Sequence, residues 1–261
     1  MNIAIVGYGK MGKLYDSLLK AKFIIDLNPV LNKIYFSSVE EFIAYRQHVD
    51  LVIVATPIQD HFAVAKKLLE NKYNVLCEKP ICFSSNEAKV LERLAEKNNL
   101  ILYQSTLERY NPLIKYFQKN INKEEIDEIT SYRFGLVPNR SFSMNPRFDL
   151  GIHDVDLWFY LFKGLVSWKI NVGYGKIRRE IVVRMKDKSI LKLDLLEKVL
   201  QHDSLILDFS KAPTNNPILE MILDLRYKQQ KMNERWSDEV KILESSMGNS
   251  ITLNKNYYSY Q

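Results

Sequence analysis

Cysteine is scarce in this sequence: Cys77 and Cys82 are the only two among 261 residues. They lie five residues apart, which is neither a CxxC motif nor a spacing typical of metal ligands. We therefore expect no disulfide framework and no bound metal. A reducing compartment fits this cysteine usage better than an oxidising one.

Long hydrophobic runs are missing as well. No apolar stretch approaches the roughly 20 residues that a membrane-spanning helix needs. The first residues lack both a basic leader and a small-residue cleavage site. We expect a cytoplasmic protein that does not bind membranes.

The excess of positive charge is modest, because 37 Lys and Arg stand against 31 Asp and Glu, a formal net charge of +6. The one basic cluster, at 226–231, is followed by acidic residues in the same helical-looking segment. A solvated helix face accounts for this pattern, so we expect no nucleic-acid binding. The excess can instead serve an anionic cofactor or substrate. With 46% apolar residues, the chain can bury a sizeable core in one or two domains.

A glycine-rich loop follows the first predicted strand. Residues 2–6 are almost all apolar, as in a strand buried on both faces of a parallel sheet. They run into Gly7-Tyr8-Gly9-Lys10-Met11-Gly12 and then into a helical pattern. The three glycines permit a tight turn, a close approach to a pyrophosphate, and close packing of helix on strand. We expect a dinucleotide diphosphate to bind at the N-terminus of that helix.

Asp26 ends the second predicted strand, 23–26. A carboxylate at this position accepts hydrogen bonds from the adenosine ribose and repels a 2′-phosphate, so it favours NAD over NADP. Asn28 and Lys33 lie nearby and can soften this preference, which leaves NADP possible. The alternative is a turn aspartate before Asn28-Pro29 that binds nothing.

Strands and helices alternate through the rest of the first half. Further strands are predicted at 51–55, 74–77 and 100–103, and a capping box at Ser38–Glu41 opens one of the helices between them. This alternation predicts an α/β fold with a doubly wound parallel sheet. Ligands bind beyond the carboxyl ends of such strands. Residues 56–57 and 78–80 therefore join the glycine loop as candidate site segments.

The second half has a different pattern. Short segments with partial alternation, at 170–173, 180–185, 190–195 and 205–209, are separated by turn residues. They predict an antiparallel sheet with one face on helices and the other available. Because an apolar sheet face usually finds a partner, we expect a homo-dimer or tetramer.

Between the two halves, a helix over 149–157 places Asp149 and His153 one turn apart on one face. A carboxylate beside an imidazole can hold the tautomer of the ring and keep it ready to accept a proton. The alternative is a buried helix whose polar residues are only satisfied by hydrogen bonds.

These motifs together resemble the Gfo/Idh/MocA family of oxidoreductases, named after glucose-fructose oxidoreductase, inositol dehydrogenase and rhizopine catabolism. The specific part is Glu78-Lys79-Pro80 at a strand end combined with Asp149-Leu-Gly-Ile-His153-Asp. The resemblance spans roughly residues 1–165 and includes 7–12, 55–57 with His61, 108–112 and 132–135. The chain departs from the family in length, because family members commonly carry a longer second domain.

The resemblance implies an N-terminal NAD(P)-binding Rossmann domain, residues 1–107, and a shortened C-terminal α+β domain, residues 108–261, with an open, mostly antiparallel sheet. It places the cofactor at the domain junction, with the nicotinamide facing Lys79 and His153. The implied reaction moves a hydride between nicotinamide and a hydroxyl or carbonyl carbon of a sugar, inositol or nucleotide-linked sugar.

The resemblance assigns catalysis to Lys79, Asp149 and His153. Removing a hydride from an alcohol carbon requires a base near the hydroxyl proton, and a histidine titrates in the right range. A partly desolvated lysine near a positively charged nicotinamide has a lowered pKa and can bind the substrate oxygen. Asp149 would orient a second hydroxyl, the imidazole, or both.

Two further sets of residues follow from the same match. The expected cofactor-binding residues are Gly7, Tyr8, Gly9, Lys10, Met11, Gly12, Asp26, Ala55, Thr56, Pro57, His61, Glu78 and Lys79. The candidate substrate-binding residues are Arg109, Tyr110, Arg140 and Arg147, with the two later arginines suited to a phosphate or carboxylate.

Two other functions stay open on the sequence. One is a cofactor-binding sensor that kept the fold and lost turnover, although a sensor has no need of a proton acceptor. The other is an amino- or imino-acid dehydrogenase or a tetrapyrrole reductase, which should lack the combination of motifs around Lys79 and His153.

Overall fold

The structure, a computed structural model, describes residues 1–46, 48–138, 144–212, 215–227 and 235–254. Contacts divide the chain into two compact units. The first is Met1–Ser105 with Met221–Glu244, and the second is Thr106–Glu220 with Ser245–Gln261. The sequence predicts a division after residue 107 and an uninterrupted second domain, whereas in the structure Met221–Glu244 joins the first unit.

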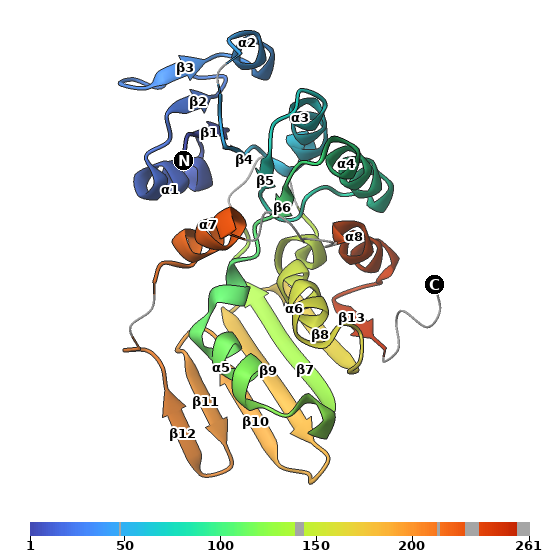
Figure 1. The fold of residues 1–261 in the computed structure, drawn as a ribbon. Coiled ribbons are helices and arrows are strands. Elements are labelled where there is room, and N and C mark those ends of the chain that lie inside the picture. The colour runs from blue at the N-terminus through green and yellow to red at the C-terminus, as the bar shows by residue number, and fades with distance from the viewer. Residues whose placement is uncertain (47, 139–143, 213–214, 228–234, 255–261) are drawn as a thin grey trace. The chain divides into compact units, whose positions relative to one another are not determined.

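Six parallel strands form the sheet of the first unit, in the order β3-β2-β1-β4-β5-β6 (Figure 1). Neighbouring β1 and β4 mark the point where the strand order reverses, which is where doubly wound sheets bind ligands. The predicted parallel sheet is confirmed. The strands are β1 (Ile3–Val6), β2 (Phe23–Ile25), β3 (Ile34–Phe36), β4 (Leu51–Val54), β5 (Val75–Cys77) and β6 (Leu102–Gln104).

Four helices connect these strands: α1 (Lys10–Leu19), α2 (Val39–Ala44), α3 (Ile58–Glu70) and α4 (Ser85–Asn98). One of the two hydrogen bonds of the predicted capping box before α2 is confirmed. The Ser38 hydroxyl accepts a hydrogen bond from the Glu41 amide at 3.1 Å. The Glu41 carboxylate accepts from the amide and hydroxyl of Ser37, at 2.7 and 2.8 Å, and not from Ser38.

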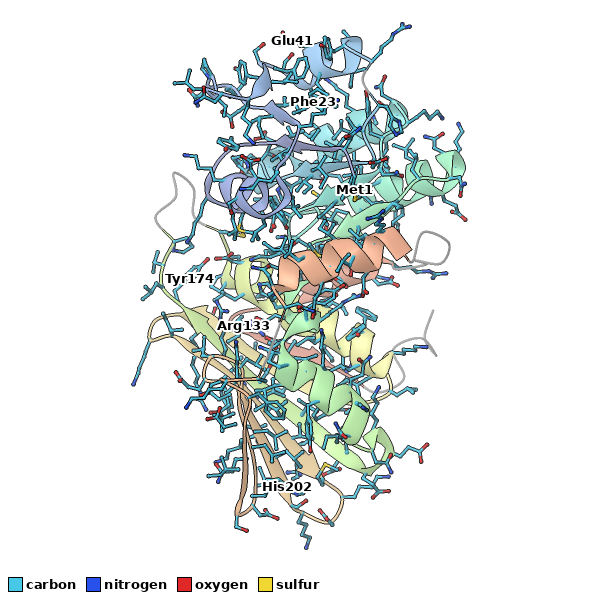
Figure 2. The ribbon with its side chains drawn as sticks, turned by 60° about the vertical axis from the view of Figure 1, so that its left-hand side comes forward. Met1, Phe23, Glu41, Arg133, Tyr174 and His202 are labelled. Carbon is cyan, nitrogen blue, oxygen red and sulfur yellow. The ribbon has the colours of Figure 1, made fainter. Side chains whose placement is uncertain are left out.

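An aromatic cluster closes the β3 edge of this unit. Phe23 of β2 is buried (Figure 2). Its ring centroid lies 6.0 Å from those of both Phe36 and Phe42. The cluster therefore ties β2, β3 and α2 together. The strand β3 was not expected, because its apolar run is only three residues long and stands between polar residues.

Helix α8 (Trp236–Ser245) explains why a late segment belongs to the first unit. The Trp236 ring lies edge-on to Tyr103 of β6, with centroids 5.3 Å apart. The amide and hydroxyl of Ser237 each donate to the Glu92 carboxylate at 2.8 Å. Helix α7 (Pro217–Tyr227) spans the point of division.

The second unit is built on a seven-stranded sheet in the order β12-β11-β10-β9-β7-β8-β13. Every neighbouring pair is antiparallel except β7 and β8, which are parallel. The expected open, mostly antiparallel sheet is confirmed. Its strands are β7 (Ile126–Gly135), β8 (Trp168–Tyr174), β9 (Arg178–Met185), β10 (Ile190–Asp194), β11 (Val199–His202), β12 (Leu205–Asp208) and β13 (Ser250–Leu253).

Helices α5 (Pro112–Asn120) and α6 (Ile152–Phe162) supply apolar side chains to the core of this unit. The Phe162 ring lies 6.1 Å from Phe117 of α5 and 5.9 Å from Trp168 of β8. Helix α6 forms the crossover that joins the two parallel strands β7 and β8, as parallel pairs require. The unit also contains two 3₁₀ turns, η1 (Leu107–Tyr110) and η2 (Lys123–Glu125), and a π-helical turn, η3 (Arg147–Gly151).

Three strands of the second sheet, β7, β11 and β13, were not predicted as strands. The ten residues of β7 mix charged and apolar side chains, and this strand is stabilised by neighbours on both sides, β8 and β9. None of the helices in the described ranges is long and apolar enough to cross a membrane.

Candidate active site

The turn between β1 and α1 is shaped by a close approach of backbones. Gly7 has φ +90°, and a Cβ there would lie 2.7 Å from the carbonyl oxygen of Ala55 and the amide nitrogen of Thr56. A Cβ on Gly12 would overlap the carbonyl oxygen of Gly7. Only glycine fits at these two positions, because backbone atoms cannot move aside as the end of a side chain can.

Asp26 lies directly after β2, and its carboxylate binds the glycine-rich loop. One oxygen accepts from the Tyr8 amide at 2.6 Å, and the other accepts from the Asn28 amide at 2.9 Å. An ionised carboxylate has about four acceptor positions. Asp26 therefore keeps capacity for ligand hydroxyls at the carboxyl end of the strand.

Asp16 of α1 gathers the polar groups beside this loop. Its carboxylate accepts from the Tyr8 hydroxyl at 2.7 Å and from the Lys33 ammonium at 2.6 Å. Burial raises the pKa of Asp16, but the hydrogen bonds from Lys33 and Tyr8 outweigh it and hold that pKa below its ordinary value. The charge of Lys33 is thus balanced by Asp16.

The segment after β5 is held on both sides of Lys79. Glu78 accepts from the Tyr15 hydroxyl at 2.7 Å, and its other oxygen lies 3.2 Å from the Lys79 amide. The Lys79-Pro80 peptide bond is cis. The amide of Ile81 donates to the Gln104 side chain at 2.8 Å, and Gln104 donates to Glu239 of α8 at 2.8 Å. Lys79 is half-buried between these anchored neighbours.

His61 of α3 links this segment to the end of β4. Its two ring nitrogens lie 2.9 Å from the carbonyl oxygens of Pro80 and Thr56, and only 2% of the residue is exposed. Burial lowers the pKa of His61, and the two carbonyl oxygens partly oppose that effect. Both ring nitrogens face protein carbonyls, so His61 joins the segment after β5 to the end of β4.

Asp149 and His153 belong to the second unit. Asp149 is buried in a π-helical turn, Arg147–Gly151, and His153 is half-buried in the first turn of α6. The Tyr174 hydroxyl lies 3.3 Å from the Asp149 carboxylate and 2.8 Å from the Met144 carbonyl oxygen. The regular helix expected over 149–157 therefore begins with a wider turn, a feature often found at functional sites.

The structure gives the candidate substrate residues different surroundings. Arg109 and Tyr110 are buried, and the Arg109 guanidinium binds the Asp156 carboxylate of α6. Arg147 donates from Nε to Asn145 at 3.3 Å, while its buried Nη1 has no hydrogen-bond partner among the described residues. Arg140 lies outside the described residues.

Comparison with known proteins shows which family the first part of the chain is similar to. Residues 1–106 match a family model described as an oxidoreductase family with an NAD-binding Rossmann fold. Over these residues the chain is similar to the Gfo/Idh/MocA family. The expected cofactor class is thereby confirmed for the first unit, whose glycine-rich turn is that of an NAD-binding domain.

Proteins similar in sequence to this chain include a nucleotide-sugar dehydrogenase and an inositol dehydrogenase. The UDP-N-acetylglucosamine 3-dehydrogenase of Acidithiobacillus ferrooxidans is 28% identical over 174 residues, which is 62% of this chain and 54% of that protein. The scyllo-inositol 2-dehydrogenase (NADP(+)) IolU of Bacillus subtilis is 22% identical over 78% of this chain and 65% of its own length. By sequence, the match with the first of these spans about half of that relative.

Solved structures extend the likeness in fold over nearly the whole chain. The same Acidithiobacillus dehydrogenase, GnnA, superposes with a TM-score of 0.75 at 20% identity and covers 94% of this chain and 95% of its own. GenD2 from gentamicin A biosynthesis, in complex with NAD, superposes with a TM-score of 0.70 at 14% identity, over 97% and 96% of the two chains. At these identities the likeness shows the fold.

The residues at the N-terminus of α1 fit an NAD diphosphate. Gly9 caps the helix without a side chain, and no heavy atom lies within 4 Å of where its Cβ would stand. The first turn of α1 contains no acidic residue, so the partial positive charge of the helix end is not neutralised there. The buried Thr56 hydroxyl has no hydrogen-bond partner among the described residues. An orphaned polar atom beside an open cradle is typical of a site that a polar ligand completes.

The supports of Lys79 were not found from the sequence. Tyr15, Gln104 and Glu239 match no motif, and all three lie in segments distant from residue 79 along the chain. One signal was present for Gln104: it ends the strand next to β5, at the carboxyl edge where ligands bind.

Two glycine substitutions should separate ligand binding from folding. Gly9→Ala places a methyl group in open space at φ −73°, which alanine tolerates, so the melting temperature should not change. That methyl group blocks the approach of the diphosphate, and NADH affinity should fall about tenfold or more. Gly12→Ala should instead cost about 1–3 kcal/mol of folding stability, because its Cβ overlaps backbone.

Thermal unfolding and NADH fluorescence titration measure the two effects. Unchanged NADH affinity in Gly9→Ala would contradict the assignment of the diphosphate to this turn. An unchanged melting temperature in Gly12→Ala would contradict the close packing of α1 on β1.

Proposed function

We propose that this chain is an NAD-dependent dehydrogenase acting on a hydroxyl carbon of a sugar derivative, with a nucleotide-linked sugar as the favoured class. The observation that carries the proposal is Lys79, an ionisable residue held between anchored neighbours at the carboxyl edge of an NAD-binding sheet. Such rigid support is what a reacting group needs and a surface lysine does not.

Each residue in the proposed reaction has one task. NAD held at the glycine-rich turn of Gly7, Gly9 and Gly12 would supply the hydride acceptor for the substrate carbon. His153 takes the hydroxyl proton as that carbon is oxidised, because an imidazole is largely neutral at neutral pH. Lys79 donates a hydrogen bond to the same oxygen, and Asp149 orients a second hydroxyl or the imidazole. In the reverse direction His153 returns the proton.

Arg147 supports an anionic substrate. Its Nη1 is buried without a partner in the described part of the chain, and a buried guanidinium N–H usually binds an acceptor. Phosphate and carboxylate oxygens suit a guanidinium, and Arg147 lies two residues before Asp149. We propose Arg147 as a contact for the diphosphate or carboxylate of the substrate, with Arg140 as a second contact.

The protein is proposed to prefer NAD to NADP. Asp26 would repel a 2′-phosphate, and Lys33, the nearby cation that could attract one, is bound to Asp16 at 2.6 Å. On the sequence, Lys33 could weaken the preference for NAD by attracting a 2′-phosphate. Its ion pair with Asp16 opposes that effect. Localisation in the cytoplasm belongs to the same proposal and agrees with the two unpaired, buried cysteines.

A homo-oligomer is proposed from exposed apolar residues on the second unit. Leu205 and Ile206 of the edge strand β12 are 53% and 64% exposed. Light scattering at micromolar concentration should give a dimer or tetramer mass, and a monomer mass would remove this part of the proposal.

The catalytic roles are tested with Lys79→Met and His153→Asn. Turnover in an NAD-linked screen over sugars, inositols, uronates and nucleotide sugars should fall about 10²-fold or more in both variants, since each loses a group that handles the proton. NADH affinity should change little. Lys72→Met, at an exposed lysine beyond α3, is the matched control and should keep full turnover.

Unchanged turnover in both variants would show that these roles are wrong. Binding of NADH without turnover of any substrate in the wild type would favour the sensor. Absence of binding of both NADH and NADPH would contradict every cofactor-based function.

The preference for NAD is tested with Asp26→Asn. This change keeps the shape of the side chain and removes the charge that faces a 2′-phosphate, so the ratio of NADPH to NADH affinity should rise about tenfold. Glu70→Gln removes a negative charge from an exposed helix end in the same unit and should leave the ratio unchanged. An unchanged ratio in Asp26→Asn would show that another residue sets the preference.

A further inference from the structure

Helix α6 carries His153 beside two buried aspartates. Asp154 follows it directly and Asp156 lies three positions after it, with 1% and 3% of their surfaces exposed. Successive residues of an α-helix are about 100° apart, so Asp154 lies about 100° to one side of His153 and Asp156 about 60° to the other. The two carboxylates therefore flank the histidine around the helix axis.

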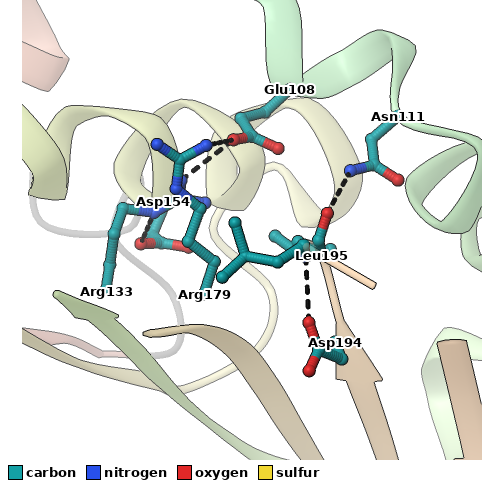
Figure 3. A network of polar contacts seen from close by, with 8 residues as sticks. Glu108, Asn111, Arg133, Asp154, Arg179, Asp194 and Leu195 are labelled. Atoms are coloured by element: carbon teal, nitrogen blue, oxygen red, sulfur yellow. Dashed lines mark hydrogen bonds and ion pairs between the residues drawn. The ribbon is translucent and has the colours of Figure 1, made fainter. Parts of the chain in front are cut away.

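Asp154 is bound from strand β7. Arg133 donates from Nε at 2.7 Å and from Nη2 at 3.3 Å to the Asp154 carboxylate, and from Nη1 to Glu108 at 3.0 Å (Figure 3). Burial lowers the pKa of Arg133, but the carboxylates of Asp154 and Glu108 outweigh it and raise that pKa. The guanidinium stays charged and holds Asp154 to the sheet.

Asp156 is bound from the 3₁₀ turn η1. Arg109 Nε lies 3.0 and 3.1 Å from the two Asp156 oxygens, and its Nη2 also donates to the same carboxylate. The guanidinium lies over the ring of Tyr160, 4.7 Å from its centroid. Tyr160 is one turn further along α6, so Arg109 contacts this helix at two successive turns.

The ion pairs of Asp154 and Asp156 are both connected to η1, because Arg133 binds Glu108 and Asp156 binds Arg109, and these two residues are neighbours in that turn. Ion pairs on both sides of His153 resist rotation of α6 about its axis. Well-packed apolar residues often give equal or better stability than a buried ion pair, so stability does not account for two such pairs. A role in orientation accounts for the two pairs better. A guanidinium and a carboxylate bind in one plane, so each pair fixes the direction of the groups that it joins.

We propose that Arg109 and Arg133 are positioning residues that fix the rotation of α6 and so the direction of the His153 imidazole. The expected effect on turnover rests on the proposed function. The orientation of α6 rests on the ion pairs alone. Arg109 then acts through Asp156 and not on the substrate, in contrast to the substrate contact expected from the sequence.

The test replaces the Arg109–Asp156 pair by apolar residues. Arg109→Met with Asp156→Leu leaves no lone buried charge and should keep the melting temperature close to that of the wild type. Turnover number should still fall about tenfold or more, because the base is misdirected, while the dissociation constant of NADH stays unchanged. Arg179→Met is the matched control, since Arg179 is half-exposed and lies 3.8 Å from Glu108 in the same charge cluster. Arg179→Met should leave the melting temperature, the turnover number and the dissociation constant of NADH unchanged.

A second readout needs no substrate. The protein has four histidines, and ¹⁵N spectra of the rings, assigned with His153→Gln, report the tautomer and protonation of His153. Its signals should shift in the double variant and stay in place in Arg179→Met. If the double variant does not fold, Arg109→Lys keeps the charge, loses the planar pairing, and should show the same two effects in smaller measure.

Unchanged turnover and unchanged His153 signals in a folded variant would overturn the positioning role. A wild type that turns over no substrate, with His153 signals that still shift in the variant, would remove the proposed function and leave the positioning role standing.

Discussion

The approach of the glycine-rich turn to the end of β4 is the constraint on which the first unit depends. Gly7 sits against the backbone of Ala55 and Thr56, and Gly12 sits against Gly7. This contact sets α1 on β1 at the point where the strand order reverses. Around this contact lie the N-terminus of α1, the carboxylate of Asp26 and the buried Thr56 hydroxyl. Their positive helix end and polar groups fit a dinucleotide.

Hydrogen bonds with side chains also fix the segment that follows β5. Glu78, Pro80 and Ile81 are each held by a side chain from a different helix or strand, while Lys79 between them is half-buried. Partners are required because a buried polar group without one costs free energy. The same rule applies to the second unit, where the charges on either side of His153 are paired and those pairs also orient α6.

Much of this could be predicted from the sequence, and the reason is local. Apolar runs such as Leu51–Val54 have the pattern of strands buried on both faces, and the spacing of Gly7, Gly9 and Gly12 has a physical reason at each position. Strand β7 was missed because its buried charged residue, Arg133, is paired with carboxylates from other segments of the chain, Asp154 and Glu108. Distance along the chain likewise hides Tyr15 and Gln104 as supports of Lys79.

The sequence by itself determined the doubly wound sheet, the dinucleotide turn, the acid after β2 and the residue types available for hydride chemistry. These depend on periodicity and on short spacings that act within one strand–turn–helix unit. Only the tertiary structure decided that His61 joins two backbone segments, that Arg109 holds α6, that Asp149 lies in a π-helical turn, and that α8 belongs to the first unit. Those outcomes depend on which polar groups become buried together, and burial is set by packing between segments far apart in the chain.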